Sequence, residues 1–302
     1  MSVSRDVLEA LSTTHIRDPI PLEALAPALN SKPFIPSKSL INIRDLGAVP
    51  GSAIRPGLIF RSGMLDAAAA DPEAISWLAS NVKTVFDLRS VEERAAYPSP
   101  EVPGVEFVYH ERVATYPQPT PADFAVDDGS TAWREQLMAV MAAYKPSLRA
   151  VLQHVKDNPN EPFLFHCTGK KTALYYVQHN SEKLPRLITP YSTKAGRDRT
   201  GVTAGLLQTL AGTPEKDVIL DYMLSRIGTE PARERLIAFV KDNIDVQDYE
   251  VPGFWNMVSL RPTFWKAFVG GVDAEYGGWE GYVKGLGFSG EELKTIKKNL
   301  RG

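Results

Sequence analysis

Short runs rich in β-branched and aromatic residues alternate with helical patterns over the first two thirds of the chain, and this alternation limits the possible folds more than any other feature. The helical segments carry start signals, such as the capping box of Ser90 and Glu93 and a proline, Pro146, at a first turn. Alternating units of this kind predict an α/β fold with a central, partly parallel sheet flanked by helices. The expected strands are Leu58–Arg61, Thr84–Leu88, Val105–Tyr109 and Pro162–His166.

The remainder of the chain is predicted to be almost wholly helical after Gly201, with a last helix started by Ser289 and Glu292. We expect these helices to form a C-terminal layer and lid. The Pro-rich stretch over residues 115–130 is expected to be a long exposed loop. With 302 residues, 43% of them hydrophobic, the chain can bury a large core, and we predict a single domain over 1–302 with an N-terminal extension over 1–40.

Charge and cysteine content exclude several classes of function. Lys and Arg number 34 against 36 Asp and Glu, so the formal charge of −2 provides no overall field that would recruit nucleic acid or an anionic membrane. The sequence shows neither a signal-peptide pattern nor an apolar run of about 18 residues, so we expect no membrane span. One cysteine cannot form an internal disulfide, which is typical of a reducing compartment, and we expect a cytoplasmic protein.

An interrupted motif follows the strand that ends at His166. Deleting the 26 residues 169–194 joins Thr168 to Ala195 and gives HCTAGRDRTG, in which five residues separate Cys167 from Arg199. A strand that delivers a thiolate, a short loop whose N–H groups surround an anion, and a helix N-terminus pointing at the same anion together form a phosphate site. We refer to the chain without 169–194 as the rejoined form.

Each residue of this motif has an expected role. Cys167 is the candidate nucleophile, and the positive field of the loop favours its thiolate. Arg199 offers a planar, permanently charged fork for two phosphate oxygens. A lone cysteine after an apolar strand is more often a small buried hydrophobic residue, so the prediction depends on the whole motif. The expected phosphate-binding residues are Thr168, Ala195, Gly196, Arg197, Asp198 and Arg199.

Six sequence blocks occur in an order that is similar to the atypical tyrosine phosphatase family, which includes secreted bacterial tyrosine and phosphoinositide phosphatases and many fungal relatives. The resemblance begins near Asn42 and implies a cysteine-phosphatase-like fold, a phosphocysteine intermediate, and a phosphotyrosine protein or a phosphoinositide as substrate. No metal or cofactor is expected. The blocks are NIRDLGAVPG, RPGLIFRSGML, TVFDLRSVEE, the rejoined HCTAGRDRTG, DYMLSR and EYGGWEGYVKGLGFSGEEL.

The resemblance also implies that the general acid is the aspartate inside the loop, Asp198. The alternative role for Asp198 is to cap the helix that follows. Rival acids lie in the Pro-rich loop at Asp123, Asp127 and Asp128.

The remaining candidates support the site. Thr200 can donate its hydroxyl to the cysteine sulfur, or cap the helix. Arg197 stands where relatives commonly carry Lys, either as a second cation for substrates with several phosphates or as a solvated surface residue. His166 is placed beside the nucleophile, and Asp87 and Arg89 are expected to form scaffold ion pairs near the site rather than to act in catalysis.

The 26 residues between the two halves of the motif need an explanation. Inserted in a folded cradle, they would strain the loop, whose ends must lie about 3.8 Å apart. A retained intron accounts for them, because Gly169-Lys170 can be encoded with a GTAAG donor and Lys194-Ala195 with an AG acceptor. The hypothesis is then a phosphatase active in the rejoined form. The alternatives are a catalytically inactive phosphate-binding or interaction protein, in which the insertion is real, and a rhodanese-like sulfur carrier.

Overall fold

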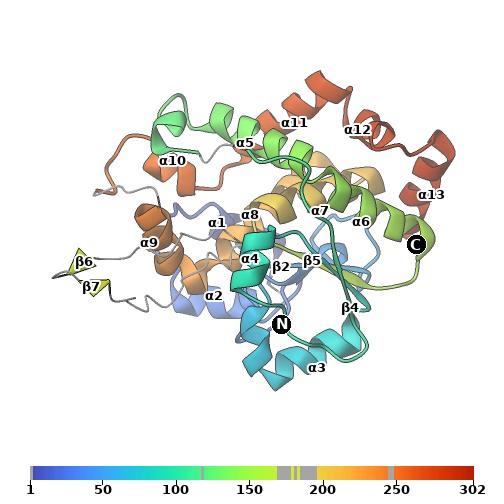
Figure 1. Ribbon diagram of the computed structural model, residues 1–302, viewed down its shortest axis with the longest axis horizontal. Helices are drawn as coiled ribbons and strands as arrows, with labels where there is room; N and C mark the ends of the chain where they lie inside the picture. The colour runs from blue at the N-terminus through green and yellow to red at the C-terminus, as the bar shows by residue number, and fades with distance from the viewer. Residues whose placement is uncertain (1–2, 117–118, 169–177, 180–181, 184–195, 244–247) are drawn as a thin grey trace.

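A five-stranded sheet forms the centre of the protein in a computed structural model that describes residues 3–116, 119–168, 178–179, 182–183, 196–243 and 248–302 (Figure 1). Parallel pairing joins β2 to β5, β5 to β3 and β3 to β4, while β1 pairs antiparallel with β2. All four predicted strands are confirmed. The strands, in sheet order, are β1 (Arg44–Asp45), β2 (Ile59–Ser62), β5 (Phe163–His166), β3 (Thr84–Asp87) and β4 (Glu106–Tyr109).

The predicted alternation of strands and helices is confirmed. Both predicted capping boxes are present, at Ser90 with Glu93 and at Ser289 with Glu292. The helices of the first half are α1 (Arg5–Ser12), α2 (Leu22–Leu29), α3 (Pro72–Asn81), α4 (Val91–Ala96), α5 (Ser130–Ala143) and α6 (Lys145–Asp157). Those of the second half are α7 (Asp198–Ala211), α8 (Glu215–Gly228), α9 (Arg233–Asn243), α10 (Phe254–Val258), α11 (Pro262–Tyr276), α12 (Trp279–Gly285) and α13 (Gly290–Arg301).

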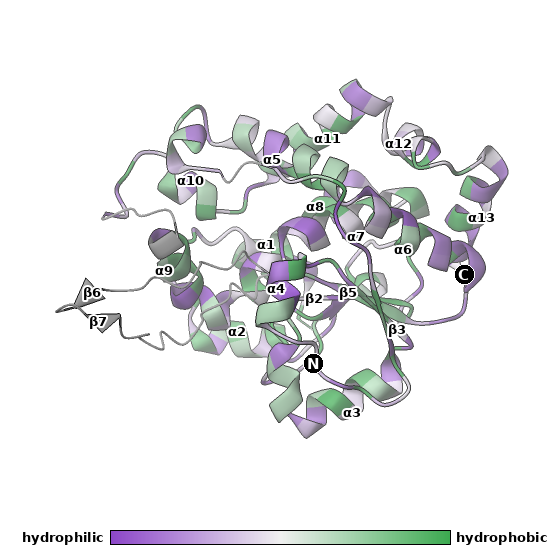
Figure 2. Cartoon of the chain, viewed as in Figure 1, coloured by the Kyte–Doolittle hydropathy of each residue, from purple (hydrophilic) through white to green (hydrophobic). Residues whose placement is uncertain are grey.

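Side chains that alternate along the strands build a hydrophobic core on each face of the sheet. Phe163 and Phe165 of β5 pack with residues of α5, α6, α7, α11 and α13, whereas Leu164 packs on the opposite face with Leu78 of α3. This period of two is the pattern expected of a buried strand. Figure 2 shows hydrophobic residues along the strands, and Figure 1 shows α3 on one side of the sheet with α5, α6 and α7 on the other.

The N-terminal segment is packed against the rest of the chain through α8. Leu8 of α1 and Leu25 of α2 share a buried hydrophobic cluster with Leu220, Leu224 and Ile227 of α8. Burial of several aliphatic side chains at about 1.5–3 kcal/mol each is enough to hold two helices of eight residues that would not be stable alone.

The prediction of a long exposed loop over 115–130 is wrong in part. A 3₁₀ helix, η3 (Pro121–Phe124), interrupts the stretch, and its Phe124 is fully buried against Trp133 of α5. A single aromatic residue in a polar segment carries no periodicity, so the sequence pattern could not reveal that it anchors the loop.

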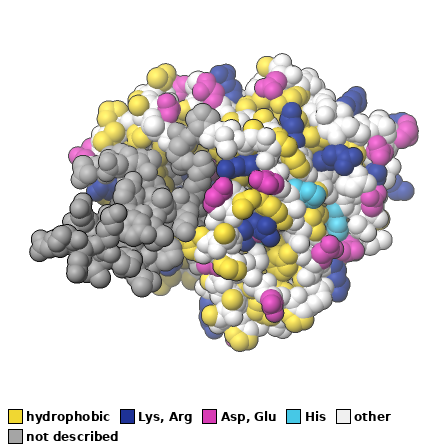
Figure 3. Space-filling model, viewed as in Figure 1, with side chains coloured by type: hydrophobic (Ala, Val, Ile, Leu, Met, Phe, Trp, Pro, Cys, Tyr) yellow, Lys and Arg dark blue, Asp and Glu magenta, His cyan; other side chains and the backbone are white. Residues whose placement is uncertain are grey.

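The surface and the predicted insertion complete the description of the fold. Acidic and basic side chains are interspersed on the face shown in Figure 3, as the small net charge implies. No helix among the described residues is long and apolar enough to cross a membrane.

The predicted insertion, 169–194, lies outside the described residues except for a two-stranded antiparallel pair, β6 (Gln178–His179) with β7 (Glu182–Lys183).

Candidate active site

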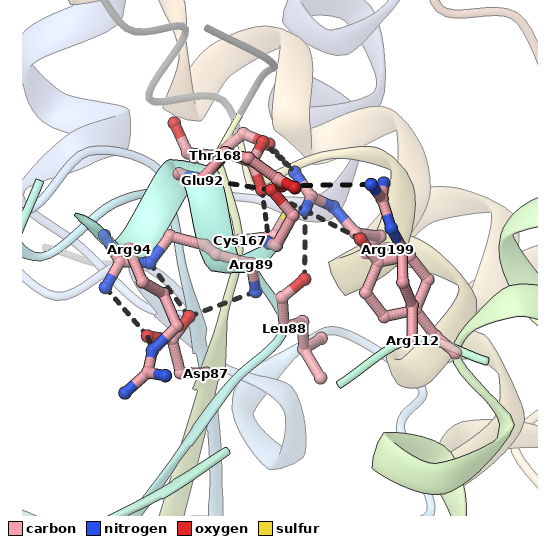
Figure 4. Close-up of polar contacts among 12 residues, drawn as sticks. Asp87, Leu88, Arg89, Glu92, Arg94, Arg112, Cys167, Thr168 and Arg199 are labelled. Atoms are coloured by element: carbon pink, nitrogen blue, oxygen red, sulfur yellow. Dashed lines mark hydrogen bonds and ion pairs between the residues drawn. The ribbon is translucent and has the colours of Figure 1, made fainter. Parts of the chain in front are cut away.

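The two halves of the interrupted motif lie side by side at the carboxyl end of β5. Cys167 follows β5 and is 2% exposed, and the Thr200 hydroxyl of α7 donates a hydrogen bond to its sulfur at 3.0 Å. The guanidinium of Arg199 donates to the carbonyl of Thr168 across the same junction (Figure 4). The fold therefore places a thiol, an arginine and a helix N-terminus at one point, although 31 positions separate Thr168 from Arg199 in the chain.

Glu93 of α4 holds Arg199 in a bidentate ion pair. The Nη1–Oε2 and Nη2–Oε1 distances are 2.5 and 2.9 Å, and Nη1 also donates to the carbonyl of Leu88 and to the Tyr144 hydroxyl. Burial alone would lower the pKa of Arg199, but Glu93, Tyr144 and Cys167 together outweigh it and raise the pKa well above its usual value. Arg199 is therefore always charged and its fork has a fixed direction.

Glu93 is a site residue that sequence reasoning missed. The sequence identified it only as part of a capping box, and its Oε2 does accept the N–H of Ser90 at 2.7 Å. The same carboxylate therefore caps α4 and orients the arginine of the phosphate loop. The sequence carries no signal for this second role, because Glu93 is 2% exposed only in the folded chain, where a buried carboxylate needs a charged partner.

A second buried network holds the loop from below, at Gly196. The Gly196 carbonyl accepts hydrogen bonds from Arg61 Nη2 of β2 at 3.0 Å and from Asn42 Nδ2 at 3.3 Å. Its φ is +56°, and a Cβ there would lie 2.2 Å from the Ser62 carbonyl oxygen, so only glycine fits. This peptide of the loop is thus fixed by the sheet beneath it.

Asp221 of α8 organises that second network. It accepts from Arg44 Nε at 2.7 Å and from Arg61 Nη1 at 2.5 Å, and all three side chains are at most 2% exposed. Burial alone would raise the pKa of Asp221, but the two guanidinium charges outweigh it and lower the pKa. Sequence reasoning missed these three roles, although a charged residue inside an apolar strand or helix pattern, as in IFRS and DVILDYML, is a signal for a buried pair.

Asp87 and Arg89 form the predicted ion pair, which is buried at the end of β3. Arg89 Nη2 lies 2.7 Å from Asp87 Oδ2, and Arg94 contacts the same carboxylate (Figure 4). Burial alone would raise the pKa of Asp87, but the adjacent His166 and Arg89, with hydrogen bonds from Arg89, hold it well below its usual range. Burial lowers the pKa of His166 to about 4, so the ring beside the nucleophile is neutral at pH 7.

Asp198 and Arg197 lie at the cavity above Cys167, but the rival aspartates do not line it. Asp198 is the first residue of α7 and accepts from Arg197 Nε at 2.6 Å, while Arg197 lies over the Trp133 ring at 4.4 Å. The N-cap position belongs to Arg197, which makes no side-chain cap. The rivals serve local turns: Asp123 bonds Thr120, Asp127 bonds Gly129 and Ser130, and Asp128 bonds Ser130 and Thr263.

Ala195, the remaining predicted loop residue, lies outside the described residues. The other five predicted phosphate-binding residues, Thr168 and Gly196 to Arg199, are brought together at the cavity floor with Cys167.

The cavity has a polar floor and mostly apolar walls. Its volume is about 210 Å³. Helices α5, α9 and α10 supply most of the wall, and two arginines, Arg226 and Arg233, lie at its edge, where both pair with Glu230. The apolar wall residues include Trp133, Leu137, Val140, Leu236, Ile237, Phe239, Val240, Met257 and Val258. Such a site accepts an anionic group at its floor and an apolar body above it.

Comparison with known proteins agrees with this geometry. The model of a family described as "tyrosine phosphatase family" matches residues 35–171 and 189–302, more than half of the chain. The residues between the two matched segments fall within the predicted insertion.

Two curated relatives match over most of their length. A "tyrosine-protein phosphatase" of Nostoc commune is 24% identical over 239 residues, covering 76% of this chain and 69% of the relative. The "triple specificity protein phosphatase PtpB" of Mycobacterium tuberculosis (strain ATCC 25618 / H37Rv) is 25% identical over 284 residues, covering 86% of this chain and 96% of the relative.

Proposed function

The chain belongs to the tyrosine phosphatase family, and we propose that it hydrolyses phosphomonoesters through a phosphocysteine intermediate at Cys167. One observation carries the proposal: Cys167 and Arg199 line the same cavity although the motif is interrupted in the chain, and the buried Thr200 hydroxyl donates a hydrogen bond to the Cys167 sulfur. A buried sulfur that only filled space would not need a hydroxyl donor and a permanently charged fork beside it.

The proposed reaction has two steps. In the first, the Cys167 thiolate attacks phosphorus, the bond from phosphorus to the ester oxygen breaks, and Asp198 gives that oxygen its proton. In the second, water attacks the phosphocysteine and gives a proton to the Asp198 carboxylate. The phosphorus–sulfur bond breaks, and Thr200 stabilises the leaving thiolate through its hydrogen bond. Arg199 and the loop N–H groups balance the charge of the phosphoryl oxygens throughout.

The cavity favours an aryl phosphate, such as phosphotyrosine, over a phosphoinositide. Its walls are apolar, which suits an aromatic ring. A phosphoinositide headgroup carries several phosphates and hydroxyls that need free cations and polar partners. Arg226 and Arg233 are already paired with Glu230 and Glu234, and Arg197 is paired with Asp198. Comparing kcat/KM for a phosphotyrosine peptide and for a soluble phosphoinositide tests this preference.

We also propose that the active protein is the rejoined form. The gap between the two family-matched segments lies inside 169–194 and supports an addition to the family's sequence. Sequencing transcripts across Thr168–Ala195 tests whether the segment is removed. Assaying the full chain and the rejoined form side by side tests its effect. If the transcript retains the segment and only the rejoined form turns over substrate, the natural protein is the catalytically inactive alternative.

The nucleophile is tested with Cys167→Ser in the rejoined form. Serine is not ionised at neutral pH, so turnover should be abolished while the loop still binds phosphate esters. Turnover is measured with an aryl phosphate and binding by calorimetry. Full activity of Cys167→Ser would contradict the proposed reaction.

The general acid is tested by the dependence of rate on leaving group. Asp198→Asn should slow esters with poor leaving groups by about a hundredfold or more and barely affect esters whose leaving groups depart without a proton. Matched controls are Asp123→Asn, Asp127→Asn and Asp128→Asn, which should show the wild-type dependence. A purely structural aspartate would affect both kinds of ester alike, and a steep dependence in one control would transfer the role to that residue.

A further inference from the structure

We propose that residues 13–20, between α1 and α2, form a strap that closes one side of the substrate cavity, and that Ile16 in this strap is a specificity-determining residue. This inference rests on the proposed function, because it takes the substrate to occupy the cavity. Ile16 lines the cavity together with residues of α9 and α10. It also packs against the hydrophobic cluster of Ile237, Phe254 and Val258, and this contact holds its side chain in the cavity wall.

Arg226 of α8 fixes the inner side of the strap. Its guanidinium donates to three strap carbonyls: from Nε to Thr14 at 3.0 Å, and from Nη2 to Asp18 at 2.6 Å and to His15 at 3.4 Å. Arg226 is 2% exposed, and a buried guanidinium that satisfies several backbone acceptors holds a turn of chain in one geometry.

Glu230 and Arg233 extend this anchorage toward α9. Arg233 Nη1 donates to the Ile16 carbonyl at 3.3 Å, which fixes the backbone of the residue that faces the cavity. Glu230 pairs with Arg226 and Arg233, and its Oε1 accepts the N–H of Ile20 at 2.9 Å, where the strap ends. The strap is therefore held at both ends and in its middle by one buried charged residue, Arg226, and two partly buried ones, Glu230 and Arg233.

Arg17 connects the outer side of the strap to the opposite wall. Its guanidinium lies 4.5 Å from the centre of the Trp255 ring of α10 and 3.3 Å from Glu250. Trp255 Nε1 also donates to Glu250 at 3.4 Å. The strap thus spans from α8 to α10, across one side of the cavity.

The strap is outside the part of the chain that matches the tyrosine phosphatase family, which begins at residue 35. The cavity floor and the α9 and α10 walls lie inside the matched part. A wall added from outside the matched region changes which substrates fit without changing the chemistry at the floor. For that reason we assign Ile16 to selection of the substrate's apolar body, and not to the reaction.

Binding to the full chain and to the rejoined form tests the role of Ile16. Ile16→Ala should raise the dissociation constant of phenylphosphonate by about three- to tenfold, because part of an apolar contact is lost. The dissociation constant of inorganic phosphate, which reaches only the floor, should stay unchanged. Leu22→Ala is the matched control, since Leu22 is an aliphatic residue of the same N-terminal segment that is 73% exposed and does not line the cavity. Equal phenylphosphonate binding by Ile16→Ala and wild type overturns the assignment.

Hydrogen exchange in the full chain tests the strap without any bound phosphate. Arg17→Ala should speed exchange of the amides of α10 several-fold and leave those of α13, which the strap does not touch, unchanged. Unchanged exchange in α10 overturns the strap. If neither form binds phosphate or phenylphosphonate, the proposed function and the substrate role of Ile16 both fail. If both ligands bind but Ile16→Ala and Arg17→Ala give the same results as wild type, the proposed function stands and the inference fails.

Discussion

Two buried networks of arginine and carboxylate hold the phosphate loop, and they differ in what reaches the cavity. In the first, Glu93 of α4 binds Arg199, which lines the cavity floor. In the second, Asp221 of α8 binds Arg44 and Arg61, and none of these three residues lines the cavity. The second network meets the site at the Gly196 carbonyl, which accepts a hydrogen bond from Arg61.

The difference shows that an arginine–carboxylate pair can have two roles: it can orient a charged side chain in a cavity, or it can fix the backbone beneath it. Arg199 lines a cavity where an anion can bind. Its partner, Glu93, therefore orients a guanidinium group that would contact the substrate. Arg61 donates to the Gly196 carbonyl, so its partner, Asp221, helps to fix the position of that peptide group. We expect changes in the first network to affect mainly turnover, and changes in the second mainly stability.

The largest expected effect is on stability, from Asp221→Asn. This substitution leaves the guanidinium groups of Arg44 and Arg61 buried side by side without a counter-charge, which costs about 3–5 kcal/mol when a buried pair is broken. The free energy of unfolding is measured by urea denaturation. Glu291→Gln, in an exposed pair with Lys294, is the control and should change it by less than about 1 kcal/mol. A similar small loss in Asp221→Asn would show that this network does not support the fold.

The next largest effect is on turnover, from Arg199→Lys in the rejoined form. A lysine keeps a charge opposite Glu93 but cannot present a planar fork, so kcat/KM for an aryl phosphate should fall by about 10²–10³-fold. The matched control is Arg61→Lys, the same change in the second network, which should lower stability and cost less than about tenfold in kcat/KM. Equal losses of kcat/KM in the two variants would remove the distinction between the networks.

The contrast also explains what the sequence could predict. The four longer strands could be predicted because each is a short run rich in β-branched and aromatic residues bounded by loop signals, whereas β1 has two residues, too few for any pattern. Cys167, Arg199 and Thr200 were found because they belong to one motif with fixed spacing. Glu93 could not be found in this way, since 106 positions separate it from Arg199.

Asp221 was missed for the same reason. Its pairing with Arg61 joins positions 160 apart, and only the fold brings α8 beneath β2. A single sequence shows that a charge lies within an apolar pattern, but it does not show which opposite charge meets it. The residues that meet at Cys167 could therefore be predicted from the sequence, and the charged residues that hold them in place could not.

The smallest expected effect concerns His166, which lies near the first network but is kept uncharged. Its ring is fully buried, Nε2 is 3.7 Å from Asp87 Oδ1, and neither ring nitrogen has a hydrogen-bond partner among the described residues. Burial lowers its pKa to about 4, with repulsion from Arg89, Arg199 and Arg94 adding to the effect and Asp87 opposing it. At neutral pH the positive charge near Cys167 therefore comes from arginine side chains and not from His166.

This neutrality predicts the sign of a pH dependence. An unfolded histidine titrates near pH 6.5, so between about pH 6.5 and 4 the unfolded chain binds a proton that the folded chain does not. The free energy of unfolding should therefore fall as the pH falls through this range, by up to about 1.4 kcal/mol per pH unit from this group. The pKa of Asp87 is also lowered in the folded protein, so its carboxyl adds a slope of the same sign at the acid end of this range, below about pH 5, where an unfolded aspartate begins to bind a proton. The arginines stay charged throughout and add none.

The comparison of wild type with His166→Gln isolates that contribution. The variant lacks the proton site, so its free energy of unfolding should decline less steeply between pH 6.5 and pH 4.5, measured by urea denaturation at several pH values. His110→Gln is the control, because His110 is exposed to solvent, and it should keep the wild-type slope. If His166→Gln also keeps that slope, the folded ring takes up a proton as readily as the unfolded one. The positive charge next to Cys167 would then include the imidazolium in addition to the guanidinium groups of Arg197 and Arg199, which line the cavity floor.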